Sequence, residues 1–233
     1  MRGVFVTGTD TGVGKTVFCA GLAWALKKRH IDVGVMKPFA TANRVFSKRY
    51  RSEDTAMLAR AAGSREGDAD LNPSFYDLAA SPMMASSLTG KPPPAIDAVQ
   101  ESLRRLASKH EFLIVEGIGG IMVPLTVSST LADFAKVADL PVLIVTRPGL
   151  GTLNHTVLTV NACKDYGLRI AGIVVNSMPR IPNLVERNNP DALNKLTNVP
   201  VIGIIPKLRV PSYSSAGRTI EKAIDLDSLI SMK

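Results

Sequence analysis

Residues 8–16 read GTDTGVGKT and directly follow the short apolar run Val4-Phe5-Val6. A strand, a glycine-rich loop, Gly-Lys-Thr and a helix, in that order, are typical of a loop that binds phosphates. The usual pattern is G-x-x-x-x-G-K-[ST], but here Thr9 stands where the first glycine is expected and Gly8 comes one place earlier. The stretch therefore predicts a variant phosphate-binding loop; a plain Gly/Thr-rich turn is the alternative, and the order of elements disfavours it.

Length and composition bound the possible fold. The chain has 233 residues, of which 45% are hydrophobic and 21% charged, as in an ordinary globular protein. This length suits one large domain or two small ones, and we expect a single domain over residues 1–233. No apolar run approaches the roughly 20 residues that span a bilayer, and no signal-peptide pattern precedes the first strand. We expect a cytoplasmic protein with no membrane partner.

Cysteine content and charge exclude further classes. Cys19 and Cys163 each fall inside a predicted helix, which indicates buried or inert thiols instead of a disulfide framework or a metal cluster. The net charge of +8 permits nucleic-acid binding. However, the basic residues are spread out, and the one dense cluster, RVFSKRYRS at 44–52, lacks a groove-reading helix. We expect no nucleic-acid partner, because attraction of polyanionic substrates explains the charge equally well.

Strand-like and helix-like segments alternate along the chain. The strand-like runs are short, rich in Val and Ile, and apolar on both faces, as in a parallel sheet covered by helices; they lie at 4–6, 33–36, 112–115, 142–145, 170–175 and 201–205. Segments with apolar residues at three- and four-residue steps lie between them, at 14–30, 95–110, 130–139 and 152–167. Residues 92–94 and 179–183 are predicted loops. The pattern predicts a doubly wound α/β fold of the P-loop NTPase type, with a mostly parallel sheet flanked by helices.

The predicted loop has the groups that hold a triphosphate. Gly8, Gly12 and Gly14 allow the backbone N–H groups to turn inward, and the helix that starts near Lys15 adds partial positive charge. Lys15 would neutralise the β and γ phosphates, while the hydroxyl of Thr16 would bind Mg²⁺.

Other polar residues stand where strands end, at the sheet edge where such folds bind ligands. Lys37 follows the second strand, and Pro38 stops that strand. Glu116 follows the hydrophobic strand FLIV, where a second magnesium ligand is expected. Asp54 lies near a predicted helix start, where the helix dipole alone would also favour an acid.

Three later segments complete the set of candidates. Glycines lead into residues 152–154, which suggests a second helix N-terminus open to an anion, with a simple helix cap as the alternative. Asn176 ends the fifth strand, and its amide can pair with a purine edge. The turn at Ile205-Pro206 could form a wall beside the base.

With these elements in place, the sequence resembles the dethiobiotin synthetase family across nearly its whole length. The shared segments, in order, are FVTGTDTGVGKT, KPFAT, EDTAML, VEGIGG, VPL, LADFA, PVLIV, GTLNH, GIVVN and IP. The early glycine of the phosphate loop belongs to this family pattern. Gly12 and Ser177 stand where better-known members can carry an acid, so the nucleotide preference is left open, and the 44–52 stretch has no assigned counterpart.

The resemblance implies a set of roles. The ATP and Mg²⁺ site would comprise Thr11, Gly12, Val13, Gly14, Lys15, Thr16, Val17, Asp54, Glu116, Gly117 and Gly119, with Thr16, Asp54 and Glu116 on the metal. The base would contact Asn176, Ser177, Ile205, Pro206 and Lys207. The substrate would contact Lys37 and Thr41, together with Gly151, Thr152 and Asn154 of a second copy in a homodimer. Lys37, Lys15 and Thr11 are the expected catalytic residues.

The implied reaction joins 7,8-diaminononanoate, CO₂ and ATP. A carbamate forms, ATP phosphorylates it, and the second amine closes the ureido ring. An alkyl amine with a pKa near 10 is roughly 99% or more protonated at pH 7, and only the neutral amine attacks CO₂. We hypothesise that Lys37, with Lys15 and Mg²⁺, favours the free amine and stabilises the carbamate and the transferring phosphoryl group.

Two other classes share this type of fold. A partitioning-type ATPase switch would carry a second lysine early in the loop, where this chain reads Thr9-Asp10-Thr11. A glutamine-fed amidoligase of the cobyrinic type would need an amidotransferase domain with a nucleophilic cysteine, and this chain has neither the length nor a suitable cysteine.

Overall fold

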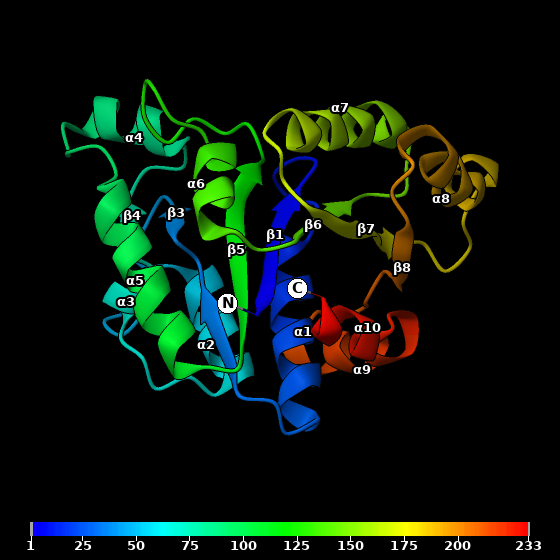
Figure 1. The fold of residues 1–233 in the computed structure, drawn as a ribbon, viewed down its shortest axis with the longest axis horizontal. Coiled ribbons are helices and arrows are strands. Elements are labelled where there is room, and N and C mark those ends of the chain that lie inside the picture. Colours follow the sequence, from blue (N-terminus) through cyan, green and yellow to red (C-terminus); the bar gives the residue numbers. More distant parts are fainter. Residues whose placement is uncertain (1, 233) are drawn as a thin grey trace.

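A six-stranded sheet forms the centre of the computed structural model, which describes residues 2–232 (Figure 1). The strand order is β2-β5-β1-β6-β7-β8, and every neighbouring pair is parallel. The strands are β1 Gly3–Gly8, β2 Val33–Met36, β5 Phe112–Gly120, β6 Val142–Thr146, β7 Ile170–Met178 and β8 Val201–Pro206. Each of the six predicted runs forms one of these strands, so the predicted parallel α/β class is confirmed.

Helices cover both faces of this sheet. They are α1 Lys15–Lys28, α2 Glu53–Ala62, α3 Asp68–Leu71, α4 Pro82–Thr89, α5 Ile96–Lys109, α6 Leu131–Ala138, α7 Thr152–Asp165, α8 Leu184–Thr197, α9 Tyr213–Ala223 and α10 Leu226–Ser231. The chain crosses from β1 to β2 in one direction along the sheet and returns through β5, β6, β7 and β8 in the other. Right-handed crossovers therefore place α1 on one face and α5, α6, α7 and α8 on the opposite face. None of the helices within residues 2–232 has the length and apolar character to cross a membrane.

A second, two-stranded sheet pairs β3 Phe39–Thr41 with β4 Ser74–Tyr76 in parallel. It was not predicted, because strands of three residues are too short to show a period in the sequence. The end of α3, just before β4, holds the segment after β2: the backbone N–H of Lys37 donates to the carbonyl of Leu71 at 2.7 Å, and the amide of buried Asn72 donates to the carbonyl of Lys37 at 2.7 Å. The backbone of Lys37 is thus bonded on both sides.

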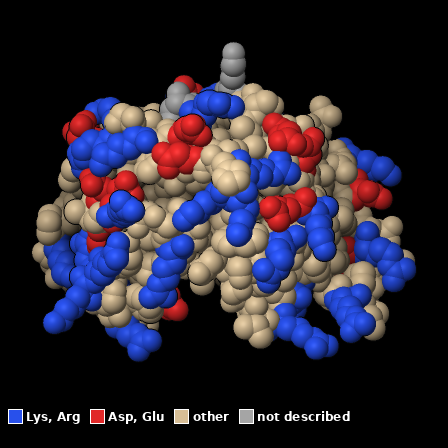
Figure 2. All heavy atoms as spheres, turned by 90° about the horizontal axis from the view of Figure 1, so that it is seen from below, with Lys and Arg blue, Asp and Glu red and all other residues tan. Residues whose placement is uncertain are grey.

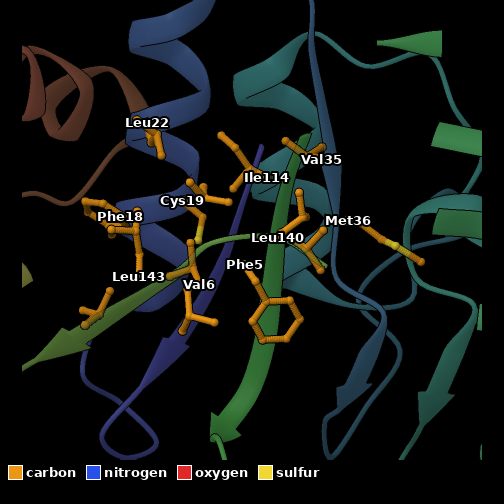
Figure 3. Packing of buried hydrophobic residues seen from close by; sticks show 14 of the residues in the cluster. Phe5, Val6, Phe18, Cys19, Leu22, Val35, Met36, Ile114, Leu140 and Leu143 are labelled. Atoms are coloured by element: carbon orange, nitrogen blue, oxygen red, sulfur yellow. The ribbon is translucent and has the colours of Figure 1, made fainter. Parts of the chain in front are cut away.

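Buried apolar side chains pack α1 against the central sheet. Figure 3 shows Phe18 and Cys19 of α1 near Val6 of β1 and Leu143 of β6, with Leu22 one turn further along the helix, and all five side chains are almost completely buried. Burial of one large apolar side chain contributes about 1.5 to 3 kcal/mol, so this contact resists separation of the helix from the strands. The loop between β1 and α1 is therefore held firmly at both ends.

Candidate active site

The loop at residues 9–14 takes its shape from glycines. Gly12 and Gly14 have φ values of 77° and 90°, in the left-handed region that favours glycine. A Cβ on Gly8 would lie 2.7 Å from a side-chain carbon of Val13 and 2.9 Å from the carbonyl of Asp10. The early glycine noted in the sequence is therefore required, because the loop folds back over the end of β1.

Lys15 opens helix α1 and points back over this loop. It is 6% exposed, and its Nζ donates to the carbonyl of Asp10 at 3.1 Å. Burial lowers the pKa of Lys15, and the positive charge of nearby Lys37 lowers it further. The backbone N–H of Thr11 is held by the side chain of Asp10 at 2.7 Å. A lysine at a helix N-terminus beside inward-turned backbone is the arrangement that binds phosphate.

Lys37 joins two carboxylates at the edge of the sheet. Its Nζ lies 2.5 Å from Oε1 of Glu116 and 2.9 Å from Oδ2 of Asp54. The hydroxyl of Thr16 donates to the same oxygen of Glu116 at 2.7 Å. Lys37 and Glu116 are buried, whereas the side chain of Asp54 is 42% exposed. The fold therefore brings together four predicted residues from β5, the segment after β2, α1 and α2.

The charges in this cluster shift each other's ionisation. Burial lowers the pKa of Lys37, but the attraction of Glu116 and Asp54 outweighs burial and raises it. Burial raises the pKa of Asp54, and the charge of Lys37 more than reverses that effect, so the net pKa is lowered. Lys37 is held as an ammonium ion that donates hydrogen bonds.

The oxygens of this cluster fit a magnesium ion. Oε2 of Glu116 is buried and has no hydrogen-bond partner among the described residues, so one lone-pair face of the carboxylate is unsatisfied. Mg²⁺ is usually bound by one or two carboxylates together with phosphate and water oxygens. Residues 2–232 hold no group of three or more His, Cys, Asp or Glu side chains suited to a metal. That Thr16, Asp54 and Glu116 bind Mg²⁺ together with phosphate oxygens stays a prediction, which the two carboxylates and the hydroxyl gathered here fit.

A cavity of about 650 Å³ lies above this cluster. Of the site residues predicted from the sequence, the following line this cavity: Thr11, Gly12, Gly14, Lys15, Thr16, Val17, Lys37, Thr41, Asp54, Glu116 and Gly119. Gly117 lies at its base, where its carbonyl is 3.4 Å from Nζ of Lys37. Five further lining residues were not predicted: Ala79, Ala80, Ser81, Ile118 and Val123. The pair Ser81-Pro82 was a usable signal, since Ser81 caps α4 and proline is favoured at the first position of a helix.

Asn176 reaches the phosphate loop from β7. Its Nδ2 donates to the carbonyl of Val13 at 2.8 Å, and a Cβ on Gly14 would lie 2.2 Å from the same nitrogen. The side-chain amide of Asn176 thus stabilises the loop, and its second proton and its oxygen remain available to hydrogen-bond a nucleotide base. Ser177 follows with a φ of 62° and is exposed, outside the cavity lining.

The predicted base turn at the end of β8 lies apart from the cavity. The side chain of Ile205 is buried in the core, 3% exposed, so contact between this turn and a base stays a prediction that would rest on the backbone of Ile205 and on its neighbours. Pro206 is exposed and lines a separate hollow against α9. The backbone N–H of Lys207 donates to the carbonyl of Met178 at 2.7 Å, which joins this turn to the end of β7 beside Asn176.

The start of α7 also lies outside the cavity lining of the same chain. Gly151 has a φ of 91°, as the sharp entry into the helix requires, and Asn154 is exposed. Thr152 is 1% exposed, and its hydroxyl pairs with that of Thr146 at 2.7 Å. Its backbone N–H donates to Gly149 at 3.2 Å, so within this chain both polar groups of Thr152 have internal partners.

Comparisons with known proteins agree with this geometry. A family model described as an AAA domain matches residues 2–212. The ATP-dependent dethiobiotin synthetase of Bacillus licheniformis is 40% identical over 230 residues, which cover 99% of this chain and 96% of that protein. The enzyme of the same name from Nitrosopumilus maritimus is 41% identical over 231 residues, covering 99% of this chain and 100% of that protein.

A solved structure supports the fold class separately. The septum site-determining protein MinD from Pyrococcus horikoshii, complexed with Mg-ADP, has a TM-score of 0.60 and 17% identity over 92% of this chain and 86% of that one. A likeness at this identity concerns the fold alone, so it does not favour the partitioning-type switch. Because an identity of 40–41% extends over 99% of the chain, this chain belongs to the ATP-dependent dethiobiotin synthetase family.

Proposed function

We propose that this chain, acting as a single P-loop domain, converts 7,8-diaminononanoate, CO₂ and ATP into dethiobiotin, ADP and phosphate. The observation that carries the proposal is the single cavity in which Lys15 of the phosphate loop faces the Lys37, Glu116 and Asp54 cluster. A nucleotide and a small amine can meet there within reach of both ammonium groups. Positioning and charge stabilisation supply most of the catalysis in phosphoryl transfer.

The chain's own residues would share the work as follows. The loop from Thr11 to Thr16 would bind the triphosphate through backbone N–H groups, with Lys15 over the β and γ phosphates. Lys37, fixed between two carboxylates, would present its charge to the carbamate that forms on the substrate. Thr41 lies on the same cavity wall and would contact the diamine.

Mg²⁺ would be held by Thr16, Asp54 and Glu116. When bound, it would neutralise charge on the phosphates during transfer. Glu116 supports this proposal most directly, because it lines the cavity and its buried oxygen Oε2 has no hydrogen-bond partner among the described residues. The base would lie toward Asn176 and the turn at Pro206 and Lys207, which the backbone bond to Met178 holds together.

We further propose that two copies form the working unit. The start of α7, with Gly151, Thr152 and Asn154, does not line the cavity of its own chain. Leu150 and Leu158, on the same segment, are 90% and 60% exposed. Exposed apolar side chains beside a helix N-terminus suit an interface at which a second copy would offer that N-terminus to the substrate carboxylate.

One assay tests the proposed function. The protein is incubated with 7,8-diaminononanoate, bicarbonate, Mg²⁺ and each nucleoside triphosphate in turn, and dethiobiotin is measured. We expect dethiobiotin only when diamine and nucleotide are both present, and a fall of about 100-fold or more in Lys15→Ala with an unchanged circular dichroism spectrum. ATP hydrolysis without any need for the diamine, and without dethiobiotin, would instead indicate a nucleotide switch.

A further inference from the structure

A further hollow, of about 400 Å³, lies at the end of the molecule where α1 finishes. It is lined by Trp24, Lys27, Lys28, His30, Arg60, Ala61 and Tyr213. Figure 2 looks at the molecule from this end and shows Lys and Arg side chains over much of the surface. We refer to this set of residues as the Trp24 pocket. No role in the proposed reaction uses it.

The Trp24 pocket carries positive charge that the chain does not balance. Within residues 2–232, no ion pair to an acid involves Lys27, Lys28, Arg60 or Arg218, which lies over the ring of Trp24. The C-terminal ends of α1 and α2 nearby each supply roughly half a negative charge. Two such ends offset about one unit of the three cations that line the pocket, so a net charge of about +2 remains for an anion, with Arg218 beside it.

Aromatic groups in the pocket add hydrogen-bond donors. Nζ of Lys28 and Cζ of Arg218 lie 5.5 and 5.9 Å from the centre of the Trp24 ring, within range of cation–π attraction. In the described part of the chain, neither the indole N–H of Trp24 nor the hydroxyl of Tyr213 has a hydrogen-bond partner. Trp24 and Tyr213 thus line the pocket with two neutral donors that are free to bond an oxyanion.

Close backbone contacts hold these groups in place. A Cβ on Gly217 of α9 would lie 2.3 Å from a ring carbon of Trp24, and a Cβ on Gly63 after α2 would lie 1.9 Å from Nζ of Lys27. The ring therefore rests directly on Gly217, whereas the ammonium of Lys27 ends a flexible side chain that lies over Gly63. The pocket walls come from α1, α2 and α9, which pack on one another.

We propose that the Trp24 pocket binds a multiply charged phosphate group, either free pyrophosphate or the diphosphate of a nucleotide. The net charge calls for an anion of two or more units, and phosphate oxygens accept from ammonium, guanidinium, indole and phenol donors alike. The site is separate from the phosphate loop, because Trp24 lies nine positions after Lys15, about 13 Å along α1. This inference does not depend on the proposed reaction.

Trp24 is the single tryptophan of the chain, so its fluorescence reports on this pocket. The full-length protein is titrated with pyrophosphate, ADP, inorganic phosphate and sulfate, with calorimetry in parallel. We expect a saturable change with pyrophosphate or ADP, and at least about tenfold weaker binding of phosphate and sulfate. Affinity should fall as salt is raised, because the contacts are ionic and partly exposed. In Lys15→Ala, where the phosphate loop is weakened, tighter binding of ADP than of pyrophosphate would identify a nucleotide as the ligand of the pocket, and tighter binding of pyrophosphate would identify the free anion.

Three variants make the test decisive. In a Lys15→Ala background, which removes the lysine contact of the phosphate loop, Arg60→Ala combined with Arg218→Ala should weaken binding by about tenfold or more; calorimetry is used because Arg218 also touches the reporter ring. Lys109→Ala, an exposed lysine in the last turn of α5, is the matched control and should change nothing. Lys15→Ala should keep the Trp24 signal. The proposal is overturned by no saturable change at millimolar pyrophosphate and ADP, by unchanged affinity in the double variant, or by loss of the signal in Lys15→Ala.

Discussion

Lys37 is the residue at which we expect a structural role and a chemical role to coincide. It is buried, and it is the counterion of Glu116, whose side chain is inaccessible to solvent. Removing one partner of a buried ion pair leaves an uncompensated charge, whereas a surface pair contributes little. The substitution Lys37→Met therefore tests the structural and the chemical role at once.

In Lys37→Met, we expect the free energy of unfolding without Mg²⁺ to fall by about 3 kcal/mol, measured by urea denaturation. Mg²⁺ should restore more stability to this variant than to the parent, because it supplies charge near Glu116. Turnover should fall by about 100-fold, with an altered pH profile. Lys91→Met, which removes a half-exposed pair with Asp77, is the control and should change stability by about 0.5 kcal/mol or less. Unchanged turnover and pH profile in Lys37→Met would refute the catalytic role.

The two thiols give a second prediction at this scale. Burial raises the pKa of Cys163 to about 12, and burial, followed by the charge of Glu116, raises the pKa of Cys19. At pH 8 a thiol with a pKa near 12 is ionised in about one molecule in ten thousand. The folded protein should therefore not react with a thiol reagent at pH 8, while both cysteines should react in denaturant. Rapid labelling of the folded protein would contradict the burial described for both residues.

Among the elements, the phosphate loop and α7 are joined by a cluster of threonine hydroxyls. Thr146, at the end of β6, is bonded to Thr9 at 3.1 Å, Thr152 at 2.7 Å and Thr156 at 3.0 Å. A hydroxyl has one proton and accepts two bonds, so three partners use all of its capacity. Thr156 donates to the hydroxyl of Thr146. The hydroxyl of Thr146 then donates its own proton to either Thr9 or Thr152, and whichever of these two hydroxyls does not accept that proton donates to Thr146.

Thr146→Val keeps the shape of the side chain and removes all three bonds. We expect the free energy of unfolding to fall by about 2 kcal/mol, because the buried hydroxyls of Thr152 and Thr156 lose a partner. The KM for ATP and the KM for the diamine should both rise, since the substitution loosens Thr9 in the loop and the start of α7. Thr159→Val is the matched control, because that hydroxyl bonds only within α7, to His155 at 2.8 Å. Equal effects of the two substitutions would argue against a link between the elements.

The elements differ in how far the sequence revealed them. The six strands of the central sheet were predictable because strands buried on both faces appear as continuous apolar runs. Helix α8 was not predicted: Pro190 lies inside it, and its first half, LVERNNP, has few strong helix formers. At the site, strand ends identified Lys37 and Glu116, but not their direct contact. The inward turn of Thr152 also depends on Thr146, six residues away, which no local pattern shows.

At the scale of the whole molecule, the proposed pair of copies explains why the start of α7 lies away from its own cavity. The test of whether the two copies share a site uses two inactive variants. Lys15→Ala removes the phosphate contact, and Asn154→Asp places a negative charge where a second copy would meet the substrate carboxylate. Each variant alone should make little dethiobiotin, and native mass spectrometry should show dimers of both.

Mixing the two variants separates a shared site from a site within one chain. In a mixed dimer, the phosphate loop of the Asn154→Asp copy faces the intact α7 of the Lys15→Ala copy, so one of the two sites is complete. Random exchange makes half of the dimers mixed, and the specific activity should therefore recover to about one quarter of the parent value. If each site lies within one chain, both sites of a mixed dimer carry a defect and no activity returns. Leu158→Arg, on an apolar side chain that is 60% exposed, should prevent the recovery by charging the interface.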